Sequence, residues 1–345
     1  MTAAIAPRRL GFFTRLLDQT DAAGRYRLAV EQIVHAERCG FDSAWIAQHH
    51  FHEAEGGLPA PFVFLAHAAA RTTRIRLGTG IVTLPLELPL RVAEDAAVTD
   101  LMSDGRLEVG IGPGGNLSAF KAFGLDSADR HLLMDRNLEL LRTAWGGGAL
   151  PGGDRLYPAN TGLVDRLWQA TFTVAGARRA GLAGDGLMLS RTQPRSPQAP
   201  QASLADIQNP MIDAYLAALP RGRVPRILAS RTIYVADDRK EALHFAELGL
   251  ARQRQRLAAT RDLASGMLLG DMIRAFDVHI GTPDEVIASL QADSTLERAT
   301  DITMQVHSID PPHAYILRAI ELMAEKVAPA FGWAPPAAAG ERRVA

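Results

Sequence analysis

The stretch Asp-Ser-Ala-Trp-Ile-Ala-Gln-His-His-Phe-His-Glu-Ala-Glu, residues 42–55, decides how the rest of the chain is interpreted. Residues 43–47 have the character of a short buried strand, which runs directly into Gln48 and into histidines at 49, 50 and 52. A core strand would not end in this way, because burying such groups without partners costs a few kcal/mol each. Where a strand opens into a cleft, imidazoles can move protons near neutral pH. Because His49 and His50 point to opposite sides of the strand, we expect at most one of them to face a common pocket.

Composition excludes several classes of protein. Of the 345 residues, 47% are apolar, which is enough for a large core, and the net charge of −1 indicates no surface for nucleic acid. The single cysteine, Cys39, excludes an intramolecular disulfide and a multi-cysteine zinc site. We find no signal peptide and no apolar run of membrane-spanning length. We therefore expect a cytoplasmic protein without membrane contact.

Strand and helix patterns alternate along the chain. The expected strands are 10–16, 43–47, 75–83, 107–111, 167–172, 187–191, 227–235 and 301–306. A helical pattern follows each strand, and such alternation predicts a parallel sheet. Eight units with right-handed crossovers predict an α/β fold of the (β/α)8 barrel type. We expect one barrel domain over residues 1–332 and a disordered tail over 333–345.

Two regions exceed what a minimal barrel needs. The glycine-rich segment 146–154 and the residues up to 165 indicate an insertion after the fourth helix. Around the seventh strand, segment 192–202 has three prolines and no apolar periodicity, which is typical of a lid. Segment 240–276 is mostly helical and is longer than one barrel helix.

An open, doubly wound sheet is the alternative fold. Gly110, Gly112 and Gly115 match the spacing G-x-G-x-x-G of dinucleotide-binding proteins. In those proteins a helix opens directly after the third glycine. Here residues 116–126 intervene, so the motif is weak support for that fold.

The expected strand ends are rich in glycine and small hydroxyl residues, which would admit a flat ligand close to the backbone. Thr173, Val174, Ala175 and Gly176 open the fifth barrel helix, and free N–H groups at a helix N-terminus bind phosphate. A flat heterocycle that carries a phosphate is therefore a reasonable ligand class. Ordinary helix capping by Thr173 is the structural alternative.

Several motifs in order resemble the bacterial-luciferase-like flavin monooxygenases. They are Ala-Gln-His-His-Phe (47–51), Arg-Thr-Thr-Arg-Ile-Arg-Leu-Gly-Thr-Gly (71–80), Leu-Pro-Leu-Glu-Leu-Pro-Leu-Arg-Val-Ala-Glu-Asp (84–95), Asp-Gly-Arg (104–106), Phe-Lys-Ala-Phe-Gly (120–124) and Gly-Asp-Gly-Leu-Met-Leu-Ser-Arg (184–191). The resemblance covers residues 9–235 and is looser beyond. The family has a (β/α)8 barrel, which agrees with the alternation.

The resemblance implies roles for individual residues. His49 matches a histidine that is proposed as a catalytic base beside the reactive edge of the flavin. The position before it is commonly glutamate in the family and is Gln48 here, which removes a carboxylate partner. Gly80 and Ile81 match a non-proline cis peptide under the flavin ring.

Further matches concern cofactor binding. Thr173, at the start of 173–176, matches a hydroxyl residue at the flavin phosphate, and Ser190 matches a serine near the ring. Gly112 occupies the position of a reactive cysteine in some luciferases, so that thiol is not needed. Pro113 replaces a phosphate-binding arginine, for which Arg191 or Arg178 could compensate.

The resemblance also implies a reaction. Reduced FMN from a separate reductase reacts with O2 to form a C4a-peroxyflavin, which oxygenates a small organic substrate. The protein excludes water from this intermediate. The family usually dimerises through early barrel helices, so a homodimer is expected.

Three other functions stay open. One is an F420-dependent oxidoreductase on the same fold, and another is a non-catalytic flavin-binding barrel. The third is a metallohydrolase that uses His49, His50 and His52, with His307 as the only obvious further ligand; we favour no metal site. Glu94 and Asp95 are expected to be ion-pair partners rather than catalytic acids. Trp168 and Met188 are expected in the core.

Overall fold

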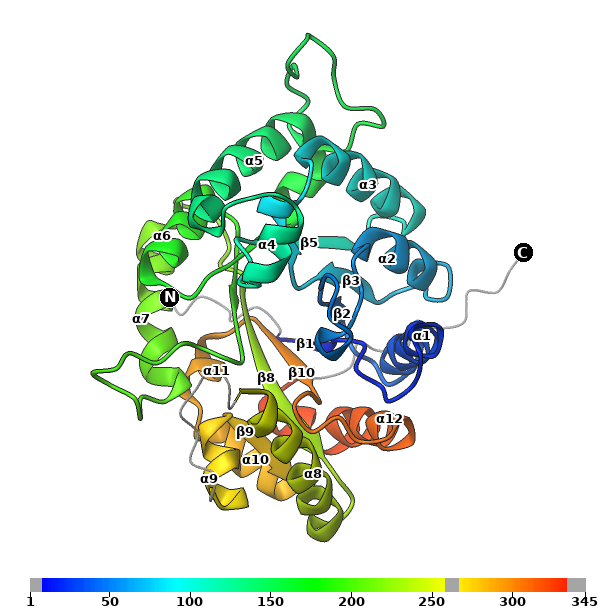
Figure 1. Ribbon diagram of the computed structural model, residues 1–345, viewed down its shortest axis with the longest axis vertical. Coiled ribbons are helices and arrows are strands. Elements are labelled where there is room, and N and C mark those ends of the chain that lie inside the picture. The colour runs from blue at the N-terminus through cyan, green and yellow to red at the C-terminus, as the bar shows by residue number, and fades with distance from the viewer. Residues whose placement is uncertain (1–7, 258–266, 334–345) are drawn as a thin grey trace.

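The computed structural model describes residues 8–257 and 267–333, in which eight parallel strands close into a barrel surrounded by helices (Figure 1). The strands are β1 Arg9–Thr14, β2 Ser43–Ile46, β3 Arg76–Thr79 with its continuation β4 Val82–Thr83, β5 Leu107–Gly112, β6 Leu167–Ala170, β7 Gly186–Leu189, β8 Ile227–Val235 and β10 Asp301–Gln305. Neighbouring strands pair in this order, and β10 pairs with both β8 and β1. This closure confirms the predicted barrel and excludes the open sheet. After β5 the next helix begins only at Leu117, so the glycine motif is not a dinucleotide-binding turn.

Helices follow the strands along the chain, as the alternation predicts. They are α1 Ala22–Arg38, α2 Pro61–Ala69, α3 Pro89–Met102, α4 Leu117–Ala122, α5 Arg130–Trp145, α6 Val174–Ala183, α7 Leu204–Ala218, α8 Arg239–Leu257, α9 Leu269–Ala275, α10 Pro283–Gln291, α11 Ser294–Arg298 and α12 His313–Leu322. Proline occupies the first turn of α2, α3 and α10, where its missing N–H costs nothing. On α3, Arg91 pairs with Glu94 and Asp95, which confirms their structural role. None of the described helices is both long and apolar enough to cross a bilayer.

The third barrel strand is broken. We predicted one strand over 75–83, but β3 stops at Thr79 and β4 resumes at Val82. The Gly80–Ile81 peptide between them is cis, which confirms the implication of the resemblance. β3 and β4 both pair with β5, so the barrel wall continues across the break.

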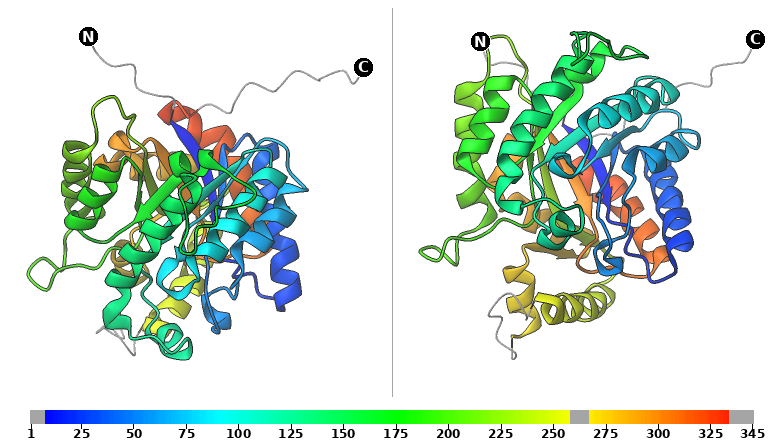
Figure 2. Two further views of the ribbon diagram at one scale, coloured as in Figure 1. Left: turned by 90° about the horizontal axis from the view of Figure 1, so that it is seen from above. Right: turned by 45° about the horizontal axis from the view of Figure 1, so that its top comes forward.

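The region after β8 contains a strand that the sequence did not indicate. β8 is nine residues long, and its last three residues extend past the partners on β7 and β10. β9 Val278–Gly281 pairs with that end, while α8 and α9 occupy much of the predicted helical segment 240–276. Residues 258–266 of that segment lie outside the described residues. Figure 2 shows the α8–α9 region, in yellow, extending beyond one end of the barrel.

The structure describes the predicted insertion after the fourth barrel helix and the first residue of the predicted tail. The chain after α5 leaves the barrel as an irregular loop, seen at the top of Figure 1, and returns through a 3-10 helix at Thr161–Arg166. Trp333, which we placed in the tail, is buried and stacks on Phe331 at 4.6 Å between ring centroids. The rest of the predicted tail, 334–345, lies outside the described residues.

Two tryptophans fill the middle of the barrel. Trp45 of β2 and Trp168 of β6 are fully buried and meet edge to face, with 5.7 Å between ring centroids. A Cβ added at Gly78 would lie 2.2 Å from Trp45, and one added at Gly186 would lie 2.1 Å from Trp168. The glycines therefore make room for the indoles. Trp168 is in the core as predicted, together with Met188.

We predict that Gly186→Ala destabilises the barrel by about 1–3 kcal/mol, because the added methyl group overlaps the Trp168 ring. Urea unfolding followed by tryptophan fluorescence would measure the change. Gly115→Ala is the matched control, since a Cβ at Gly115 meets no atom within 4 Å. Equal stability of the two variants would contradict this account of the interior.

Candidate active site

His49 lies at the carboxyl end of β2, between two charged side chains that come from other segments. Nη2 of Arg15, which follows β1, lies 3.0 Å from Nε2 of His49. On the other side of the ring, Nδ1 of His49 lies 3.6 Å from Oε2 of Glu55, in the 3-10 turn Glu53–Glu55. Asn116, which caps α4, donates to the same Glu55 oxygen at 2.9 Å. Three strand ends thus contribute to the surroundings of one imidazole.

The partners of His49 determine where its proton lies. A guanidinium only donates hydrogen bonds, so Nε2 accepts from Arg15 and the neutral ring carries its proton on Nδ1. That N–H faces the Glu55 carboxylate. The His49 imidazole does most to lower the pKa of Glu55, to about 2, and Arg15 and Asn116 add to the effect. Glu55 is therefore an anion throughout the physiological range.

Gln48 has a structural role. Its side-chain oxygen accepts from the N–H of Thr83 at 2.8 Å, and its amide donates to the carbonyl of Pro59 at 3.0 Å. The amide also donates to Glu87 at 2.6 Å. Gln48 therefore ties the end of β2 to the chain beyond β4, and it does not contact His49 through any of these bonds.

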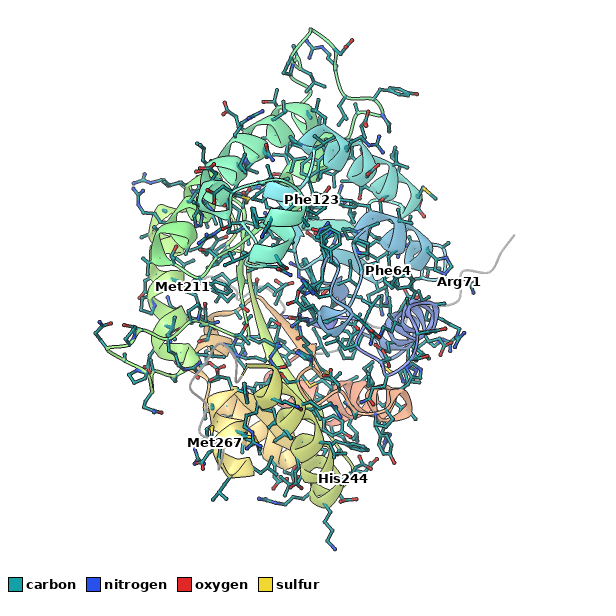
Figure 3. The ribbon with its side chains drawn as sticks, in the orientation of Figure 1. Phe64, Arg71, Phe123, Met211, His244 and Met267 are labelled. Atoms are coloured by element: carbon teal, nitrogen blue, oxygen red, sulfur yellow. The ribbon has the colours of Figure 1, made fainter. Side chains whose placement is uncertain are left out.

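The other two histidines of the cluster diverge from His49. His50 is buried against Phe123, at 5.1 Å between ring centroids, and its Nε2 has no hydrogen-bond partner among the described residues. Burial lowers the pKa of His50, with a further effect of the nearby His49. His52 is bonded to Ser118 at 2.7 Å. In Figure 3, Phe123 lies at the end of α4.

The three imidazoles do not converge, and no group of three metal-ligating side chains occurs among residues 8–257 and 267–333. This argues against the metallohydrolase.

The floor of the barrel mouth is apolar and tightly packed. Ile81 and Ala170 pack on the buried cluster of Phe13, Trp45 and their neighbours. A Cβ at Gly80 would lie 2.5 Å from the Phe13 ring, and one at Gly112 would lie 2.6 Å from Ile81. Gly80 and Gly112 are thus required by the packing of this floor, which any flat ligand in the mouth would face.

The N-terminus of α6 is accessible. Thr173 is the N-cap, and its hydroxyl accepts from the N–H of Gly176 at 3.0 Å. The N–H groups of Val174 and Ala175 are in the first turn, where a helix offers them no acceptor, and both residues are exposed. Thr173 therefore caps the helix, and the N–H groups of Val174 and Ala175 are left to bind an anion.

If the expected FMN binds in the mouth, these donors would hold its phosphate. The hydroxyl of Thr171 lies 3.3 Å from that of Thr173, and exposed Arg178 lies one turn along α6. No guanidinium is present at Pro113, so the phosphate would be met by N–H and hydroxyl groups. Of the two arginines considered as replacements, Arg178 is the one that lies on this helix.

Ser190 and Arg191 follow β7 and differ in environment. The Ser190 hydroxyl is partly exposed and lies 3.3 Å from that of Thr192. Arg191 is buried, and it donates to Gln305 at 2.6 Å and to Thr232 at 3.1 Å. Burial lowers the pKa of Arg191 to about 9, with an effect of Arg15 in the same direction. Its partners lie on β10 and β8, not on α6.

The predicted lid, 192–202, is an irregular loop with an exposed tip. Arg195 attaches it to the chain before β9, because its guanidinium contacts both carboxylate oxygens of Asp277 at 2.7 Å. Movement of this loop stays a prediction.

A small cavity beside the mouth is lined by Arg15, Gln305 and His307, among others. His307 is buried and bonded through Nδ1 to Asp310 at 2.7 Å. Burial lowers the pKa of His307 to about 4, so this imidazole is neutral near pH 7. Arg15 therefore borders this cavity, which His307 also lines, and contacts His49 as well.

Sequence reasoning missed Arg15, Glu55 and Asn116 as parts of the site. Arg15 and Glu55 are 40 residues apart in sequence, yet Arg15 Nη2 lies 3.4 Å from the Glu55 carbonyl oxygen. The available signal was Gly56, which has φ 120° and lies so close to Arg15 that a Cβ would be 2.0 Å from its carbonyl oxygen. A glycine directly after the turn indicates that the turn folds back on the barrel.

Comparisons with known proteins agree with this fold. The profile of the family described as luciferase-like monooxygenase matches residues 10–297. The 4-hydroxyprotoasukamycin monooxygenase of Streptomyces nodosus subsp. asukaensis is 27% identical over 325 residues, which cover 86% of this chain and 84% of that protein. The crystal structure of monooxygenase RslO1 from Streptomyces bottropensis is 28% identical, with a TM-score of 0.76 over 94% of this chain and 99% of that one.

Other relatives match over shorter stretches or share the fold alone. This chain spans 45% of the length of limonene 1,2-monooxygenase from Rhodococcus erythropolis, at 30% identity over 177 residues and 48% of this chain. It spans 34% of the uncharacterized protein y4vJ of Sinorhizobium fredii, at 35% identity over 120 residues and 35% of this chain. The fold is shared with a 3,6-diketocamphane monooxygenase component from Pseudomonas putida in complex with FMN, at 18% identity and a TM-score of 0.73 over 94% of this chain and 98% of that one. The fold is also shared with the F420-dependent tetrahydromethanopterin reductase of Methanopyrus kandleri, at 20% identity. The TM-score of that match is 0.69, over 94% of this chain and 100% of that one.

Proposed function

The chain belongs to the luciferase-like monooxygenase family, whose named relatives are oxygen-incorporating oxidoreductases, and we propose that it oxygenates a small organic substrate with reduced FMN and O2. The observation that carries this proposal is His49, held at the barrel mouth between Arg15 and Glu55. It stands above a tightly packed apolar floor and shares the mouth with the accessible N-terminus of α6.

Each group in the mouth has a task in this proposal. The N–H groups of Val174 and Ala175 bind the FMN phosphate, and the floor at Gly80 and Ile81 supports the ring. Reduced FMN, when bound, supplies the electrons that activate O2. His49 accepts a proton from the substrate or returns one to the product. The apolar floor excludes water, which would divert the reaction to hydrogen peroxide.

FMN is preferred over F420 on the strength of the relatives. The two that match nearly the whole of this chain at 27% and 28% identity are named monooxygenases. The F420-dependent reductase shares the fold at 20% identity. Pro113, which stands where the family has a phosphate-binding arginine, keeps F420 as the second candidate.

The proposal includes a separate reductase and a homodimer. All strands of the described residues belong to one sheet, which leaves them no second nucleotide-binding fold. Val98, Leu101 and Met102 are exposed at helical spacing on α3, and Val63 is exposed on α2, which packs against α3. Exposed apolar residues of this kind favour association. We expect twice the 37.2 kDa chain mass by light scattering, and a monomeric mass would remove the homodimer from the proposal.

We predict that His49→Ala lowers oxygenated product by about 100-fold, because proton transfer loses its base. The protein is loaded with reduced FMN without oxygen, then mixed with O2 and a panel of small organic substrates, and product and hydrogen peroxide are quantified. His52→Ala is the control, since His52 is exposed and bonded to Ser118. Full product formation by His49→Ala would refute the role of His49. If FMN binds in neither redox state, F420 becomes the cofactor to test.

We predict that Val174→Pro weakens reduced FMN binding about tenfold, because it removes one charge-assisted hydrogen bond to the phosphate. Proline is tolerated at the first helical position, and Thr173 already has the extended backbone (φ −131°, ψ 150°) that must precede proline. Riboflavin, which lacks the phosphate, should bind Val174→Pro and the control Val174→Ala equally. An equal loss for both ligands would place the phosphate elsewhere.

A further inference from the structure

The imidazole of His49 has a charged partner on each side, and the two have opposite effects on it. Arg15 donates to Nε2 at 3.0 Å, and its positive charge disfavours a second proton on the ring. Glu55 lies 3.6 Å from Nδ1, and its negative charge favours that proton. His50, the adjacent imidazole, is a further titratable group near the ring.

The position of Glu55 is fixed by several contacts. Asn116 donates to its carboxylate at 2.9 Å. Gly56, directly after Glu55, has a φ of 120° and lies against the Arg15 backbone, so the turn can fold back only with glycine there. Glu53 of the same turn is exposed and pairs with Arg25 at 3.4 Å. The chain thus orients one carboxylate of the turn toward His49 and the other toward solvent.

We propose that Glu55 and Arg15 are positioning residues that hold His49 with its proton on Nδ1 and keep Nε2 as its basic nitrogen. Gln48 is hydrogen-bonded to Thr83, Pro59 and Glu87 and supplies no carboxylate to His49, and Glu55 takes that task from beside Nδ1. The use of this arrangement in catalysis rests on the proposed function, whereas the arrangement itself can be tested without flavin or substrate.

In the proposed reaction, one proton moves from the substrate to His49. A substrate X–H gives its proton to Nε2 of His49, and the electron pair of the broken bond stays on X. The imidazolium then carries one proton on each nitrogen, with Nδ1–H facing the Glu55 anion. Arg15 then releases Nε2 and donates its hydrogen bond to the anion formed on the substrate.

The test is 15N NMR of the His49 ring in the protein without ligands, across pH. We expect Nδ1 protonated and Nε2 unprotonated in the neutral form, with His49→Ala identifying the signals. Glu55→Gln should lower the midpoint of the ring titration by about one pH unit, because the neighbouring anion is lost. Arg15→Gln should raise it by a similar amount, because the neighbouring cation is lost.

Matched variants separate this role from general structural damage. Glu53→Gln removes the same charge from the same turn and should leave the midpoint of the His49 titration unchanged. Glu55→Asp keeps the charge, so its midpoint should lie between those of Glu55→Gln and the wild type. A proton on Nε2 in the wild type, or equal midpoints for Glu55→Gln and Glu53→Gln, would overturn the proposal. If His49→Ala still forms product, the catalytic role of His49 fails, and the NMR result still decides the pairing.

Discussion

The structure depends on how the inside of the barrel is filled. Trp45 and Trp168 occupy its centre because Gly78 and Gly186 present no side chain to them. Close packing of this kind excludes water and leaves no channel through the barrel. Chemistry is thereby confined to the mouth, and the floor of the mouth is the upper surface of the packed aromatic cluster.

The same packing extends to the amino-terminal end of the strands. The indole N–H of Trp168 donates to Glu108 at 2.7 Å, and Glu108 pairs with Arg76 at 2.5 Å. Arg9 and Asp301 form a further pair, at 2.8 Å, between β1 and β10. Buried carboxylates are tolerated here because each has a guanidinium and hydrogen-bond donors within reach. These ion pairs and hydrogen bonds stabilise the amino-terminal end of the barrel. Buried polar groups at the opposite end have fewer hydrogen-bond partners.

Much of the fold follows from local signals. Helix starts at Pro61, Pro89 and Thr282 could be identified from residue type and spacing, because caps and first-turn prolines act within four residues. β9 could not, since it exists only because β8 extends beyond the barrel and needs a partner there. The cis peptide at Gly80 came from the resemblance and not from any property of the residues.

The candidate site was predictable to a similar extent. His49 and the start of α6 could be predicted, because a polar cluster after a strand and a capped helix are both recognisable from consecutive residues in the sequence. Glu55, Arg15 and Asn116 meet only after the barrel closes, and each is an ordinary surface-type residue in sequence. A pairing between segments 40 or more residues apart leaves no periodicity, so only the structure brings these residues together.

The N-terminus of α6 has a consequence for how long a flavin stays. Its donors are N–H and hydroxyl groups, and Pro113 provides no charge. A chain with a net charge of −1 also gives little long-range attraction to a phosphate. We therefore expect a short residence time that varies little with ionic strength. In the proposed reaction, a flavin held in this way would move between proteins on each turnover, so one reductase would serve many copies of this chain.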